Sequence, residues 1–175
     1  MSKNEMIMDF KKLNSEILKA YSKGEKNKDR IFIGVKENEN DFKEFYISFN
    51  GYNLYIVPGC FFPFDINALS EEYLKNNITV NNNLCSIAAK ENLNEYEAVN
   101  FEYNKPITNG YGKKIDCSIF SNDNFKIGVN NDFLKYFNLE NCILKAKNPK
   151  SPLMVFSGDN LLGLILPINF NQDNL

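Results

Sequence analysis

Residues 125–137, FKIGVNNDFLKYF, hold the stretch of sequence that decides the fold. The apolar run 125–129 predicts a strand, and the two asparagines after it are good helix N-caps. A short helix is therefore expected to begin at Asn130 or Asn131. It should run through Phe133, Leu134 and Phe137.

The end of the chain continues this pattern with three expected strands. Residues 151–167, SPLMVFSGDNLLGLILP, predict strands at 152–156 and 161–166, joined by the polar turn 157–160. A strand at 142–146 precedes them. Together these elements form a last unit, 124–170, with the order strand, helix and three strands.

The beginning of the chain, residues 6–57, has the same expected order. Apolar residues recur at a helical period from Asp9 to Ser22, which predicts an amphipathic helix. Residues 30–35 predict a strand. Asn50-Gly51 predicts a hairpin, because both residues tolerate positive φ. The hairpin would join strands at 45–49 and 52–57, and Met6 to Met8 can add a short strand before the helix.

The middle of the chain has weaker patterns. Residues 65–74 resemble a strand end that leads into a helix, 78–88 a hairpin around three asparagines, and 98–103 a strand. On this interpretation 62–103 forms a middle strand-helix-three-strand unit. Pro106, Asn109-Gly110 and Gly112 predict a loop at 104–114.

The composition favours an α+β fold in which strands dominate. Of the 175 residues 43% are hydrophobic, and the 15 Phe and 9 Tyr suit pleated strands better than a helix bundle. The hairpin connections make mainly antiparallel sheet the expectation. A chain of this length usually buries one core, so residues 1–175 are expected to form a single compact unit.

The charge balance limits the classes of partner. The chain has 20 Lys and Arg against 22 Asp and Glu, a net charge of -2. This excludes a strongly basic nucleic-acid coat protein and a strongly acidic DNA mimic. Any contact with DNA must depend on local positive charge.

The sequence offers little for catalysis, metal binding or cofactor binding. It has no His, and its four Cys, at positions 60, 85, 117 and 142, form no CxxC pair. A Cys/His zinc site and an imidazole base are therefore both excluded. Residues 110–114 lack the spacing of a phosphate-binding loop. We expect a non-catalytic protein with buried thiols, without metal or cofactor.

The apolar patterning gives an expectation for location. The N-terminal residues contain no apolar run of signal-peptide length, and the apolar stretch 161–168 is too short to cross a bilayer. A cytoplasmic protein without membrane contact is expected.

The repeated order of strand, helix and three strands resembles the DNA clamp superfamily. Residues 125–137, 151–156 and 164–168 are similar to the end of the bacterial DNA polymerase III beta-subunit sliding clamp, and element order alone extends the resemblance to the rest. The resemblance implies repeated clamp-like units and a binding role in DNA replication. A 175-residue chain is too short for the three domains of a bacterial clamp subunit.

The resemblance implies two candidate surfaces. Clamps place helices toward double-stranded DNA, and the polar face of the first helix and the residues after it carry Lys11, Lys12, Lys19, Lys23, Lys26, Lys28 and Arg30. The alternative is an ordinary solvated helix face, which is what a lysine-rich helix face usually is. Partner peptides dock beside the final strands of clamps, which assigns a partner groove to Val155, Leu164, Leu166 and Pro167. Core packing at period two is the alternative for these four.

Two classes of function therefore stay open. The first is a clamp-like, DNA-associated accessory protein that contacts replication proteins and forms a homo-oligomer. The second is a small α+β protein of a phage or another mobile element that modulates a host protein without binding DNA. A third hypothesis is an enzyme that uses Glu or Cys.

Overall fold

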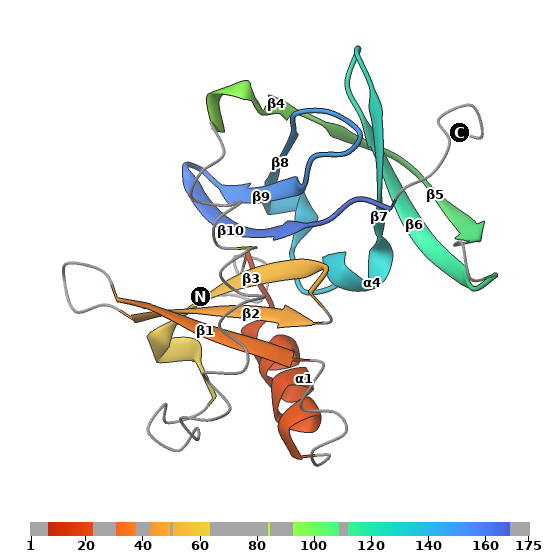
Figure 1. Cartoon of the computed structure of the whole chain (residues 1–175). Coiled ribbons are helices and arrows are strands. Elements are labelled where there is room, and N and C mark those ends of the chain that lie inside the picture. The colour runs from red at the N-terminus through yellow and green to blue at the C-terminus, as the bar shows by residue number, and fades with distance from the viewer. Residues whose placement is uncertain are drawn as a thin grey trace. The chain divides into compact units, whose positions relative to one another are not determined.

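A computed structural model describes residues 7–22, 31–37, 43–49, 51–63, 84, 93–108 and 112–168 (Figure 1). The chain divides into two compact units, where a single unit of residues 1–175 was expected. The N-terminal unit is Met8–Glu91, and the C-terminal unit is Asn92–Leu175 together with Met1–Ile7. Each unit is described by itself.

The N-terminal unit contains one described α-helix and three antiparallel strands. The helix α1 spans Phe10–Ser22. The strands are β1 (Ile31–Glu37), β2 (Lys43–Phe49) and β3 (Asn53–Pro58), with β1 paired to β2 and β2 to β3. A short 3-10 turn, η1, follows at Gly59–Phe61. The predicted helix and three strands of 6–57 are confirmed within one or two residues.

The start of α1 is fixed by Asp9. Its carboxylate oxygen Oδ1 accepts the main-chain N–H of Lys12 at 2.9 Å, and its carbonyl oxygen accepts the N–H of Leu13 at 3.0 Å. The first bond satisfies an N–H group that a helix otherwise leaves unpaired, and the second is the first hydrogen bond of the helix itself. Leu13 and Ile17, one turn apart, are both fully buried, so this face of the helix belongs to the core.

The hairpin between β2 and β3 forms as the Asn-Gly pair predicts. Gly51 has a φ of 74°, a conformation that costs glycine little. The Oδ1 atom of Asn53 closes the turn by accepting the N–H of Phe49 at 2.8 Å. In β2, Phe45 to Ser48 are all buried, so both faces of this strand are covered.

The C-terminal unit contains two groups of antiparallel strands. One is a three-stranded sheet in the order β5-β6-β7, and in the other β9 pairs with β10 and β8, and β8 with β4. The strand bounds are β4 Glu97–Ala98, β5 Asn100–Thr108, β6 Lys114–Ser121, β7 Lys126–Asn130, β8 Ile143–Ala146, β9 Leu153–Ser157 and β10 Asn160–Ile165. Helix α4 spans Asn131–Leu134, with 3-10 turns η3 at Leu93–Glu95 and η4 at Leu139–Asn141.

The predicted order of residues 124–170 is confirmed over its described part. β7 leads into α4, where the side chain of Asn130 accepts the N–H of Asp132 at 2.9 Å and so caps the helix. α4 ends at Leu134, so the predicted continuation of the helix to Phe137 is wrong. β8, β9 and β10 then follow. Gly158, in the turn between β9 and β10, has a φ of 55°.

The predicted loop at 104–114 is wrong over most of its length. β5 continues to Thr108 and β6 begins at Lys114, and β6 was not among the predicted strands. Pro106 lies within β5, directly opposite Asp116 of β6. Proline is tolerated there because β5 is an edge strand of its sheet, where a missing N–H costs no ladder hydrogen bond.

Most of the predicted middle unit, 62–103, lies outside the described residues. Leu84 is helical and buried where a strand of a hairpin was predicted, and the rest of 78–88 lies outside the described residues. The strand predicted at 98–103 corresponds to parts of β4 and β5. Of the predicted short strand at Met6 to Met8, Met8 makes only an isolated bridge, and Met6 is not described.

The described residues thus confirm an α+β fold with mainly antiparallel sheet. Clamp-like repetition of the units stays a prediction. Among the described helices, none has the length and apolar character needed to cross a membrane.

Candidate functional site

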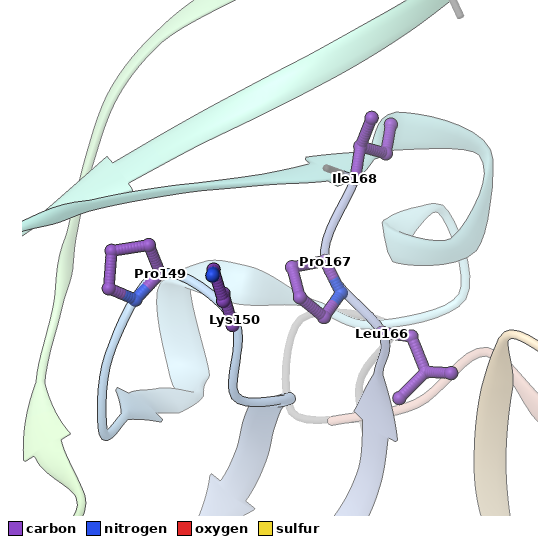
Figure 2. Close-up of a pocket in the computed structure, with 5 residues that line it drawn as sticks. All are labelled: Pro149, Lys150, Leu166, Pro167 and Ile168. Atoms are coloured by element: carbon purple, nitrogen blue, oxygen red, sulfur yellow. The ribbon is translucent and has the colours of Figure 1, made fainter. Parts of the chain in front are cut away.

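The described part of the C-terminal unit has an open hollow beside the end of β10. Its volume is about 360 Å³, at the lower end of the range of small-ligand pockets. Two segments form its walls, and Figure 2 shows both. They are the β8–β9 connection with Pro149 and Lys150, and the stretch after β10 with Leu166, Pro167 and Ile168. We call this the C-terminal hollow.

The first wall is a turn held by the side chains of Asn148 and Ser151. The hydroxyl oxygen of Ser151 accepts the N–H groups of Lys147 at 2.9 Å and Asn148 at 3.0 Å, and donates to the carbonyl oxygen of Asn148 at 2.9 Å. The Oδ1 atom of Asn148 accepts the N–H groups of Lys150 and Ser151, both at 2.9 Å. These five hydrogen bonds fix the turn that presents Pro149 and Lys150.

The second wall is tied to the three-stranded sheet. After Pro167, the N–H of Ile168 donates to the carbonyl oxygen of Gly128 in β7 at 2.8 Å. Proline restricts its own φ, which limits how the chain can leave β10. The second wall is therefore anchored by β10 at one end and by β7 at the other.

The chemistry of the C-terminal hollow is apolar with one cation. Four of its described lining residues carry aliphatic or proline side chains, and the fifth, Lys150, is exposed and carries an ammonium group. No carboxylate is found among these described lining residues. Such a site suits an apolar side chain that has an anionic group close to it.

The four residues of the predicted partner groove lie in two different environments. Leu166 and Pro167 line the hollow. Val155 and Leu164 are fully buried, so in this structure they belong to the core. Pro149, Lys150 and Ile168 were not predicted. An Asn-Pro pair at 148–149 indicates a turn, but the sequence does not show that this turn comes next to Pro167.

The predicted DNA-binding lysines are described only in part. Lys11 and Lys12 are exposed on α1, and the Nζ atom of Lys19 lies 3.1 Å from Glu16 Oε1 in an exposed ion pair. Lys12 and Lys19 are seven residues apart and so share one face of the helix. The predicted residues Lys23, Lys26, Lys28 and Arg30 lie outside the described residues.

Other ionisable groups in the C-terminal unit have structural roles. The Glu102 carboxylate accepts hydrogen bonds from Lys126 Nζ at 2.8 Å and Ser121 Oγ at 2.6 Å, and these bonds lower its pKa. Burial raises the pKa values of the Cys117 and Cys142 thiols to about 11, which removes both as nucleophiles near neutral pH. Within the described ranges, no group of three or more acidic, Cys or His side chains could hold a metal ion.

Neither a protein-family model, nor a curated protein, nor a solved structure matches this chain. By its fold, the chain is an α+β protein of mainly antiparallel sheet. The C-terminal hollow is its candidate site.

Proposed function

We propose that the chain is a non-catalytic, clamp-like binding protein of DNA replication that holds a partner peptide in the C-terminal hollow. One observation carries the proposal: the hollow lies where the chain leaves β10, the last of the described strands, with Leu166 and Pro167 in its wall. The resemblance to DNA clamps implies a partner site beside the final strands, and it assigned these two residues from sequence.

The order of elements supports the same proposal. In the N-terminal unit, α1 is followed by β1, β2 and β3. In the C-terminal unit, α4 is followed by β8, β9 and β10. In each unit these three strands are consecutive in sequence, and each pairs antiparallel with the next.

A partner peptide for the hollow can be specified by its chemistry. The apolar walls favour leucine or phenylalanine, and the Lys150 ammonium favours an aspartate next to it. The probe is therefore a fluorescein-labelled hexapeptide that carries a leucine-phenylalanine pair beside an aspartate.

Fluorescence anisotropy with this hexapeptide tests the site. Lys150→Glu should weaken binding by roughly three- to tenfold, because it places like charges together. Lys113→Glu is the matched control, since Lys113 is exposed in the same unit and does not line the hollow. Equal affinities for the wild type and Lys150→Glu, or no binding to either, would exclude the peptide site.

Association with DNA needs its own test. We expect α1 to contact phosphates without sequence preference, so affinity should fall steeply with salt. The triple variant Lys12→Glu, Lys19→Glu, Lys23→Glu should abolish binding to double-stranded DNA. The control is a second triple variant, which reverses the charge of three exposed lysines in the C-terminal unit: Lys113→Glu, Lys114→Glu, Lys135→Glu.

The outcomes of the DNA test separate the two classes of function. Unchanged DNA affinity of the α1 variant removes this helix from the interface. Absence of salt-sensitive DNA binding, together with a monomer in light scattering, removes the replication role.

One observation favours the second function, modulation of a host protein without DNA. Leu18 of α1 and Phe61 of η1 are 45% and 48% exposed. The Phe61 ring stacks on Phe10 at a centroid distance of 4.5 Å, and the Asn14 side-chain amide donates to the Phe61 carbonyl at 2.5 Å. Exposed apolar groups of this kind suit contact with another protein better than contact with phosphates. Absence of DNA binding would not exclude this second function.

A further inference from the structure

The main chain around the C-terminal hollow has almost no hydrogen-bond donor to offer a ligand. Pro149 and Pro167 have no N–H group. The N–H of Lys150 already donates to Asn148 Oδ1 at 2.9 Å, and the N–H of Ile168 already donates to a carbonyl oxygen of β7 at 2.8 Å. Four of the five described lining residues therefore cannot give a main-chain hydrogen bond to a bound peptide.

This shortage of donors argues against an extended partner. Strand addition needs N–H and C=O groups at alternating residues along an edge, and Leu166, the fifth described lining residue, would supply at most one such donor. Polyproline II peptides dock in grooves lined by aromatic side chains, and no aromatic residue is among the described lining residues. A partner must therefore be recognised through its side chains.

A helix meets this requirement, because it pairs its main-chain N–H and C=O groups with one another. We infer that the C-terminal hollow takes one face of an amphipathic helix of the partner, with two apolar side chains between the walls and an acidic side chain at Lys150. This inference rests on the proposed peptide site and specifies the conformation of the peptide.

The apolar walls and Lys150 together match such a helix face. Figure 2 shows Pro149 and Pro167 on the two separate segments that form the walls. The Lys150 side chain is exposed and pairs with none of the described carboxylates, so its ammonium group is available. Side chains at positions i, i+3 and i+4 share one face of a helix. Leucine at i and phenylalanine at i+4 would fill the hollow, and aspartate at i+3 would reach Lys150.

The first test moves the acidic residue of a peptide by one position. Two fluorescein-labelled peptides of sixteen residues, otherwise alanine and glutamine, carry the central sequences Leu-Ala-Ala-Asp-Phe and Leu-Ala-Asp-Ala-Phe. The first sequence places the three side chains on one face of a helix, and the second places them on one face of a strand. In fluorescence anisotropy the first should bind about two- to fivefold more tightly, because its aspartate pairs with Lys150. This preference should disappear in Lys150→Met and remain in the matched control Lys113→Met.

The second test breaks the helix of the peptide. Proline in place of the alanine that follows leucine should weaken binding by roughly tenfold or more, because proline inside a helix removes a hydrogen bond and clashes with the preceding turn. Proline as the first residue of the peptide is the matched control, since the first turn of a helix tolerates it. The labelled hexapeptide is too short to form a stable helix, so it should bind more weakly than the helical peptide.

The outcomes separate this inference from the proposed function. Equal binding of the two spacings, tighter binding of the strand spacing, or no loss with the interior proline overturns the helical partner and leaves the peptide site. A preference for the helical spacing that persists in Lys150→Met overturns the placing of the acidic side chain at Lys150. Absence of binding by the hexapeptide and by both longer peptides removes the proposed function and this inference together.

Discussion

The main-chain N–H of Ile168 donates a hydrogen bond to the carbonyl oxygen of Gly128 at 2.8 Å. This bond ties the segment after β10 to β7, and the same segment forms one wall of the C-terminal hollow. The Asn148–Ser151 turn fixes the other wall through its own hydrogen bonds. Both walls are therefore set by the described fold.

The Ser151 hydroxyl is expected to stabilise the first wall. Ser151→Ala removes the acceptor for the N–H groups of Lys147 and Asn148 and should lower the free energy of unfolding by about 1–3 kcal/mol. Urea unfolding measures the change. Ser157→Ala is the control, because no hydrogen bond of its hydroxyl is found in the described structure; equal effects of the two substitutions would contradict the role of Ser151.

Gly158 should be costly to replace because of its backbone conformation. Its φ is 55°, and a Cβ atom built there has nothing within 4 Å, so the cost is conformational rather than a clash. We expect Gly158→Ala to reduce stability by about 1–2 kcal/mol. Gly158→Asn should lose less, since asparagine tolerates this region better. Thermal unfolding that ranks the two variants in the opposite order would contradict this account.

Two leucines of α1 provide a matched comparison. Leu13 is fully buried, whereas Leu18 is 45% exposed on the same helix. Leu13→Ala should lower the free energy of unfolding by about 2–5 kcal/mol through lost burial and a residual cavity. Leu18→Ala should stay within about 0.5 kcal/mol of the wild type. Chemical denaturation of both variants tests which face of α1 is packed.

The Glu102–Lys126 pair predicts a pH dependence on both sides of neutrality. Hydrogen bonds from Lys126 and Ser121 lower the pKa of Glu102 below 4.5, so its stabilisation is present above pH 4.5 and is lost as the pH falls through the folded pKa. The bond to Glu102 raises the pKa of Lys126 above 10.5, so that stabilisation is lost as the pH rises beyond it.

NMR titration of the Glu102 side chain measures the acid side. Its midpoint should lie below 4.5 in the wild type and move upward in Lys126→Met, which removes the largest cause of the shift. An unchanged midpoint in Lys126→Met would show that the ion pair does not set this pKa.

The described cysteines should differ in reactivity. Cys60 is exposed, whereas burial raises the pKa values of Cys117 and Cys142 to about 11. At pH 8 a thiol reagent should therefore modify Cys60 well before Cys117 or Cys142, since the thiolate is the reacting form. Mass mapping of partly modified protein identifies the sites, and early labelling of Cys117 would contradict its burial.

The sequence by itself determined the elements whose signals are local. Leu13 and Ile17 mark the buried face of α1, Asn50-Gly51 marks the hairpin, and Asn130 marks the start of α4. Helical period, positive φ and N-capping each depend on a few neighbouring residues. The start of α1, the hairpin and the start of α4 were therefore predicted within one or two residues, whereas α4 ends at Leu134 instead of reaching Phe137.

The tertiary structure alone decided which of these elements meet. Pro106 is a loop signal by itself, and only the pairing with β6 makes it an edge-strand residue. Val155 and Leu164 have the same apolar character as Leu166, yet burial separates them from the C-terminal hollow. Pro149 and Lys150 join Ile168 there because β8, β9 and β10 pair with one another. Strand pairing brings together residues that are distant in sequence, so local sequence patterns cannot predict it.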